Sequence, residues 1–136
     1  MHKAKYVKNI GEVMAYRLTQ PEGYNRTVAL LIDKDMDGAQ NISMGLCTID
    51  PQSQIPKHAH EHEEEAMYIL KGEGIAKIED VDYILSEGSV VFCPPKVIHQ
   101  IVNPNNQKLW FIFTYGPGGP EQNVKKIGKP TEPIKM

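Results

Sequence analysis

The stretch Pro56-Lys-His-Ala-His-Glu-His-Glu-Glu-Glu-Ala-Met-Tyr-Ile-Leu-Lys-Gly72 contains three of the five histidines of the chain, a carboxylate cluster and a short apolar run. Side chains alternate between the two faces of a β-strand, so His58 and His60 on a strand point the same way and can chelate one ion. Glu65 follows after four residues, which is enough for the chain to turn and bring a carboxylate over the same face. The stretch therefore predicts part of a metal site.

The residues after Glu65 predict a strand and a tight turn. Ala66 to Leu70 is apolar, and alternation places Met67 and Ile69 on the ligand face. Lys-Gly-Glu-Gly follows as a turn, in which Gly72 and Gly74 can take positive φ.

A second stretch, from Gly88 to Asn103, supplies the remaining ligand. It contains an apolar strand, a double-proline turn and a strand that begins at His99, with Ile101 and Asn103 on the same face as that histidine unless Asn103 fixes a turn. Three imidazoles and one carboxylate suit a divalent transition metal (Fe, Mn, Ni, Zn or Co) and leave coordination positions open.

The two stretches resemble the two sequence motifs of the cupin family. The first has His-x-His, four residues, Glu, six residues and Gly; the second has Gly, five residues, Pro, then His, three residues and Asn. The resemblance implies that the family's metal ligands fall on His58, His60, Glu65 and His99.

Two positions depart from the family pattern. Gln52 stands where a glycine is expected six residues before the first histidine, and Lys96 stands where one is expected two residues after Pro94. Both are turn positions, so we expect altered loop shapes with an intact ligand set.

Neighbouring residues offer alternative ligands. His62 shares parity with the histidine pair and would be a substitute ligand, but the spacing to Glu65 favours His60. We interpret the glutamates around His62 as a solvated acidic run that favours cation capture: Glu61, Glu63 and Glu64.

The segment Asp33-Lys-Asp-Met-Asp-Gly38 resembles the start of a calcium-binding EF-hand loop. Such a loop needs a bidentate glutamate at position twelve, where Met44 stands, and no flanking helices are evident. We therefore predict a polar hairpin turn closed by Asp37-Gly38.

Composition limits the classes of function. A chain of 136 residues predicts one domain, 1–136, with a barrel core at about 27–115 and a C-terminal tail, 116–136, that is ordered only where it packs on the barrel or on a partner chain. A net charge of −2 without a basic run excludes a nucleic-acid footprint. No stretch is apolar enough for a membrane span, and residues 1–5 lack a signal-peptide core, so we predict a cytoplasmic protein in which Cys47 and Cys93 are free packing thiols.

Short strand-like segments punctuated by Gly, Pro, Asn and Asp predict an all-β fold. We expect one or two short strands within 5–18, and further strands over 27–32, 42–49, 66–70, 75–79, 83–86 and 109–115, besides those of the second motif. Without a convincing amphipathic helix or a repeat, this pattern predicts one antiparallel double-stranded β-helix, the jelly roll of the cupin barrel.

The expected pocket is largely apolar. The aromatic residues near the end of the barrel divide between the two faces of the last strand, and the sequence does not say which set lines the pocket: Trp110, Phe111, Phe113 and Tyr115. Few cationic side chains argue against a phosphorylated sugar and for a small, weakly charged or aromatic substrate.

The resemblance implies a metal-dependent enzyme that acts on a small organic molecule. Oxygenase (dioxygenase) chemistry is the leading class, with isomerase or lyase chemistry as other options, and Glu65 is expected also to accept a proton from a bound substrate. The alternative is a non-catalytic small-molecule sensor or carbohydrate-binding module. The family resemblance further implies a homodimer, in which the apolar N-terminal strands pair across the interface.

Overall fold

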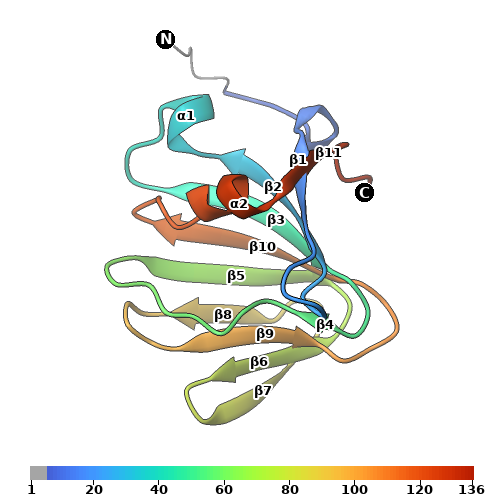
Figure 1. The fold of residues 1–136 in the computed structure, drawn as a ribbon. Coiled ribbons are helices and arrows are strands. Elements are labelled where there is room, and N and C mark those ends of the chain that lie inside the picture. The colour runs from blue at the N-terminus through green and yellow to red at the C-terminus, as the bar shows by residue number, and fades with distance from the viewer. Residues whose placement is uncertain (1–5) are drawn as a thin grey trace.

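Two antiparallel sheets form the protein in the computed structural model, which describes residues 6–136 (Figure 1). The strands are β1 (Ala15–Leu18), β2 (Arg26–Ile32), β3 (Ser43–Ile49), β4 (Ser53–Gln54), β5 (Glu64–Lys71), β6 (Gly74–Ile78), β7 (Val81–Leu85), β8 (Val90–Cys93), β9 (His99–Asn103), β10 (Leu109–Gly116) and β11 (Lys129–Thr131). The helical segments are η1 (Ile10–Glu12), α1 (Lys34–Asp37) and α2 (Gln122–Ile127). The larger sheet has the order β11-β1-β2-β3-β10-β5-β8, and the smaller has the order β4-β9-β6-β7.

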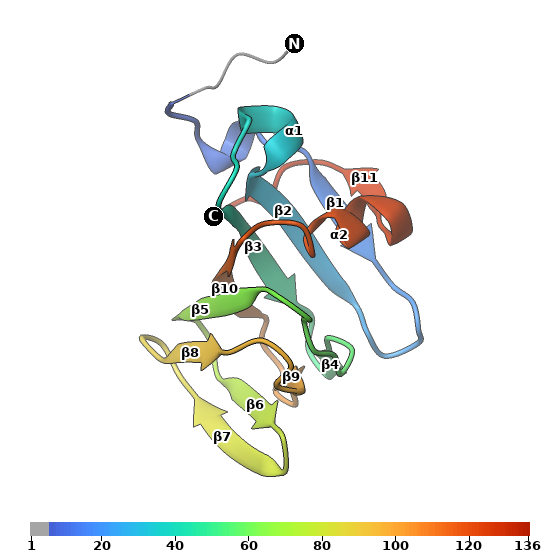
Figure 2. The ribbon, with the colours of Figure 1, turned by 90° about the vertical axis from the view of Figure 1, so that its left-hand side faces the viewer.

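The prediction of an antiparallel all-β barrel is confirmed. The turned view shows the smaller sheet curving below β5 and β8 of the larger one (Figure 2). Neither α1 nor α2 has the length or apolar character to cross a bilayer, and no other helix does so among residues 6–136.

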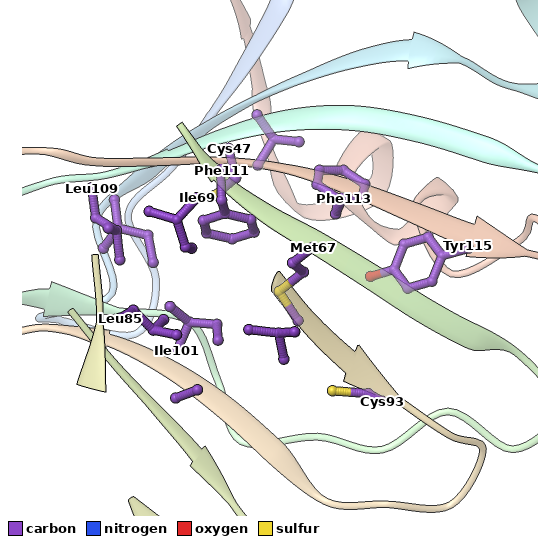
Figure 3. Packing of buried hydrophobic residues seen from close by; sticks show 14 of the residues in the cluster. Cys47, Met67, Ile69, Leu85, Cys93, Ile101, Leu109, Phe111, Phe113 and Tyr115 are labelled. Atoms are coloured by element: carbon purple, nitrogen blue, oxygen red, sulfur yellow. The ribbon is translucent and has the colours of Figure 1, made fainter. Parts of the chain in front are cut away.

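The apolar core lies between the two sheets, and its composition shows which side chains of β10 face inward. Phe111, Phe113 and Tyr115 of β10 are buried and project into the interior (Figure 3), whereas Trp110 is only partly buried. On the neighbouring β3, a Cβ added to Gly45 would clash with the Phe113 ring and lie 2.9 Å from the Ala29 carbonyl oxygen, so a glycine is needed for this close approach.

The connection between β2 and β3 is a helical turn, which corrects the predicted simple hairpin turn. Asp33 is fully buried, and its Oδ1 accepts a hydrogen bond from the backbone N–H of Met36 at 2.7 Å, capping α1. Gly38 ends the helix in the left-handed conformation, with φ of 70°. Asp37 pairs with Lys8 at 2.6 Å, so the acidic side chains of this segment have partners within the chain.

Segments outside 27–115 extend the larger sheet. The expected N-terminal strand is β1, preceded by η1 instead of a second strand, and residues 1–5 lie outside the described part of the chain. The C-terminal tail forms α2 and then β11, which pairs antiparallel with β1. The tail is thus ordered where it packs on the barrel.

Helix α2 is anchored by Asp33. Lys125 of α2 lies 2.8 Å from Oδ2 of Asp33, and Nε2 of Gln122 donates to the same oxygen at 3.0 Å. Burial raises the pKa of Asp33, but the hydrogen bonds from Lys125, Met36 and Gln122 lower the pKa by more than burial raises it. The net pKa of Asp33 is therefore below its usual range. This buried carboxylate therefore joins α2 to the β2–β3 connection.

The expectation of altered loops at the two missing glycines is wrong. Gln52 and Lys96 adopt φ of 57° and 69°, the left-handed conformation that glycine adopts most easily. Of the two glycines in the Lys-Gly-Glu-Gly turn, Gly72 takes positive φ (92°) and Gly74 does not. Gly74 is needed for close packing, because an added Cβ would lie 2.6 Å from Leu109 Cδ2.

Replacing Lys96 by glycine is expected to stabilise the protein. Removing the left-handed strain of an exposed non-glycine residue gains roughly 1 kcal/mol in the free energy of unfolding, reduced by the extra freedom of glycine in the unfolded chain. Urea denaturation followed by the fluorescence of Trp110 measures this change. Glu87→Gly is the control, since Glu87 is exposed without positive φ and should lose stability; a loss in Lys96→Gly as well would contradict the argument.

Replacing Asp33 by asparagine is expected to lower the free energy of unfolding at pH 7 by about 2 kcal/mol, because the buried pair with Lys125 is lost. A lowered folded pKa stabilises the protein above the unfolded pKa, and this contribution disappears as pH falls through the folded value. The difference between wild type and variant should therefore shrink below about pH 4 in pH-dependent urea denaturation. Asp35→Asn is the control, since exposed Asp35 also pairs with Lys125 and should change stability little. A pH-independent difference would contradict the assignment to charge.

Candidate metal centre

The two motifs meet at one backbone pair. The N–H of His58 donates to the carbonyl of His99 at 3.0 Å, and the N–H of His99 donates to the carbonyl of His58 at 2.8 Å. The segment that connects β4 to β5 has this isolated bridge but no regular strand, so the predicted strand for the His-x-His pair is wrong. The segment is extended enough for the alternation to hold, with His58 and His60 half-buried and Ala59 exposed.

Glu65 reaches the same place from the larger sheet. It lies in β5 between Cys93 of β8 and Tyr115 of β10, and it is 4% exposed. Met67 and Ile69, which alternate with it on the same face of β5, are buried as predicted, but they belong to the apolar core and not to the site. Ile101 lies in the core too, whereas Asn103 fixes a turn, donating to the carbonyls of Ile49, Asp50 and Gln107.

The structure brings the four predicted ligands together. One ligand atom from each of His58, His60, Glu65 and His99 lies within 4.8 Å of every other. The ring centroids of His58 lie 4.7 Å from His60 and 4.3 Å from His99. Residues separated by up to 41 positions therefore form one cluster with a donor set of three nitrogens and a carboxylate.

Backbone carbonyls set the tautomers of two of the imidazoles. Nδ1 of His58 lies 2.7 Å from the carbonyl oxygen of Pro56, and Nδ1 of His99 lies 2.9 Å from that of Val97. A carbonyl only accepts, so each Nδ1 carries a hydrogen, and Nε2 is directed to the cluster. Burial lowers the pKa of His58, which favours the neutral form that binds metal.

The third imidazole has an unsatisfied nitrogen. Nε2 of His60 is buried without a hydrogen-bond partner in the described chain, and it lies 3.5 Å from Oε1 of Glu65. A buried polar atom without a partner is costly, and a cation at the cluster would provide one. The residues thus fit a bound divalent metal.

Glu65 and His99 form a charged pair within the cluster. Nε2 of His99 donates to Oε1 of Glu65 at 3.0 Å. Burial lowers the pKa of His99, but the neighbouring Cys93, the Glu65 carboxylate and the Val97 carbonyl raise it to about 10. Burial raises the pKa of Glu65, but the adjacent imidazoles of His60 and His99 lower it more. A metal ion held by His99 would replace the proton on Nε2, so metal binding there would be coupled to proton release.

A cavity of about 380 Å³ opens beside the cluster, within the range of small-molecule sites. His58, His60 and Glu65 line it, and so does Tyr115, whose ring lies 4.9 Å from that of His60. Burial and the Glu65 carboxylate raise the pKa of Tyr115 well above its ordinary value, so the hydroxyl keeps its proton. The rest of the wall is mostly apolar: Leu18, Val28, Cys47, Ile55, Phe111, Phe113, Val124 and Ile127.

The sequence did not predict two parts of the cavity wall. Helix α2 and the residues before it cover one side, and Arg26 of β2 is the one Lys or Arg side chain among the residues that line the cavity. The alternation of side chains along β2 could have placed Arg26 on the inward face, because Arg26 shares that face with Val28 and Leu30, which are buried. Nothing in the sequence placed α2, because it packs through contacts with distant segments.

The neighbouring residues behave as predicted. His62 is exposed and lies outside the cluster, and the adjacent glutamates are exposed or only partly buried. Cys47 and Cys93 are buried free thiols. Burial raises the pKa of Cys47 to about 12, so this residue is a neutral packing group.

The fold and the site thus define an antiparallel barrel that carries a cluster of three histidines and a glutamate. Residues 45–115 match the family described as the Cupin domain. The chain therefore belongs to the cupin family.

The chain is also similar to solved structures and to one further sequence. A crystal structure described as a predicted oxalate decarboxylase, from Thermotoga maritima, is 26% identical, with a TM-score of 0.74 over 82% of this chain and 99% of the other. An RmlC-like cupin from Shewanella frigidimarina is 20% identical, with a TM-score of 0.70 over 90% and 99% of the two chains, which shows the fold alone. An uncharacterized protein of Methanocaldococcus jannaschii is 35% identical over 52 residues, which are 38% of this chain and 42% of that protein.

Proposed function

We propose that the protein is a metal-dependent enzyme that acts on a small organic molecule, with His58, His60, Glu65 and His99 holding one divalent transition-metal ion. The observation that carries the proposal is the convergence of these four ligand atoms within 4.8 Å of one another beside a cavity of about 380 Å³. Three nitrogens and one carboxylate oxygen leave coordination positions for a substrate.

A metal bound there supplies a Lewis acid and, if it is iron, a redox centre. The chain's own groups prepare the site. The Pro56 and Val97 carbonyls orient two imidazoles, and the protonated hydroxyl of Tyr115 lies beside Glu65 in the wall of the same cavity. The apolar wall around Phe111, Phe113 and Val124 excludes water from the substrate, which strengthens polar contacts in the cavity.

Oxygenase chemistry is the leading reaction class in this proposal. Decarboxylase or other lyase chemistry is the second candidate, favoured by the 26% identity to the Thermotoga protein described as a predicted oxalate decarboxylase. The four ligands are compatible with both, and the lining of the cavity must distinguish them.

Removing a ligand is expected to lower metal content and thermal stability together. Each of His58→Ala and His99→Ala should bind much less than one cobalt(II) per chain, because a donor is lost from a four-ligand set. Metal at about 100 times its Kd stabilises the folded wild type by about 2.7 kcal/mol, and the variants should lose this increment in metal-dependent thermal denaturation. Metal content is measured by elemental analysis after dialysis.

His62→Ala provides the matched control, because it removes a nearby exposed histidine outside the cluster. It should retain the metal content and the metal-dependent stabilisation of wild type. Full metal content in both His58→Ala and His99→Ala, or an equal loss in His62→Ala, would contradict the ligand assignment.

Turnover distinguishes the reaction classes. With iron(II)-loaded protein and a panel of small aromatic and aliphatic molecules, an oxygenase consumes oxygen at an electrode in step with loss of one panel member. Loss of a panel member without oxygen consumption supports the lyase candidate. Binding without turnover across the panel would refute both and support the sensor or binding module. His99→Ala is the inactive control.

A further inference from the structure

Arg26, at the start of β2, lines the cavity and is 6% exposed. Its Nη1 donates to the backbone carbonyl of Tyr24 at 2.7 Å. In residues 6–136, no carboxylate forms an ion pair with this guanidinium, and within the same residues Nη1 is the one guanidinium nitrogen that makes a hydrogen bond, which leaves Nε and Nη2 without one. The edge of the guanidinium formed by these two nitrogens is therefore available to a molecule in the cavity.

The acidic residues of the cavity are already engaged. Glu65 pairs with His99, and Glu121 accepts hydrogen bonds from the backbone N–H of Gly119 at 2.7 Å and from Nε2 of Gln122 at 2.8 Å. A buried cation without a counter-charge costs several kcal/mol. The other arginine on this wall of the barrel shows the usual solution, since Arg17 of β1 makes two hydrogen bonds to the carboxylate of Asp50.

We propose that Arg26 recognises a carboxylate on the molecule that occupies this cavity, so that the ligand is a small organic acid with an apolar body. A carboxylate matches the free edge of the guanidinium with two parallel hydrogen bonds. One cation balances one monoanion, whereas a phosphate dianion would need further donors, and Arg26 is the single Lys or Arg side chain among the residues lining the cavity.

The cavity wall gives the ligand its second property. Val28 lies two residues from Arg26 on the same buried face of β2, and Phe111 and Phe113 line the cavity from β10. The His/Glu cluster contributes another part of the same wall. A molecule that contacts both the cluster and Arg26 therefore places its apolar body against these side chains. The inference rests on the proposed function in that it names the substrate class of the same cavity.

Matched acids and amides test the charge requirement. Benzoate with benzamide, and hexanoate with hexanamide, differ in charge while retaining size and shape. Titration calorimetry on the cobalt(II)-loaded protein and on the chelator-treated protein should show each acid binding at least about 10-fold more tightly than its amide, as expected when a buried charge-assisted pair forms. Equal affinities, or no binding of either acid at millimolar concentration, would overturn the proposal.

Two variants test whether Arg26 causes the preference for the acid over the amide. Arg26→Met retains the length of the side chain but removes its charge, and Arg26→Gln retains an amide donor near the Tyr24 carbonyl in case the first variant folds poorly. Both should lose the preference for acid over amide. Arg17→Met is the matched control, because it removes an arginine paired with Asp50 outside the lining of the cavity, and it should keep the preference. Retention of the preference in the folded Arg26 variants, or its loss in Arg17→Met, would refute the assignment.

Cobalt(II) titration of the same variants separates this inference from the proposed function. Arg26→Met should bind cobalt(II) as wild type does, because Arg26 is not in the ligand cluster. Acid binding that persists in chelator-treated protein and in His58→Ala supports the Arg26 site even if the metal proposal fails. Normal metal binding without any acid preference supports the metal centre and refutes the Arg26 site.

Discussion

Two backbone hydrogen bonds, between His58 and His99, hold the site together. They fasten the extended segment between β4 and β5 to the first residue of β9, and this pairing brings the two imidazole centroids to 4.3 Å. Glu65 approaches from β5 of the larger sheet, whereas His99 belongs to the smaller sheet. The ligand cluster therefore spans both sheets, so that an ion bound there would also cross-link them.

Local polar groups prepare the centre before any ion arrives. The backbone carbonyls two residues before His58 and His99 accept hydrogen bonds from Nδ1 of each ring, which directs Nε2 of each ring inward. Nε2 of His60 is buried without a partner, and Glu65 remains ionised because the adjacent imidazoles outweigh the effect of burial. This arrangement is costly without a cation and favourable with one, which is the physical case for a metal at this position.

Membership of the cupin family and the donor set leave the reaction class open, because the same ligands suit several chemistries. Selectivity must come from the cavity, which combines an apolar wall, the protonated Tyr115 hydroxyl and the guanidinium of Arg26. Helix α2 closes one side of this cavity and is anchored through the buried carboxylate of Asp33. The C-terminal tail thus shapes the site, although it lies outside the two motifs.

The amino-acid sequence specified the barrel and the four clustered residues, because period-two burial and the spacing of His58, His60 and Glu65 are local properties of the chain. It did not reveal that the histidine pair lies off a regular strand, or that Lys96 keeps a glycine-like turn. Nor did it reveal that Arg26 faces the cavity or that the tail covers it. These features arise from pairings between distant segments, such as β1 with β11, whose free energy depends on long-range packing that a local pattern does not contain.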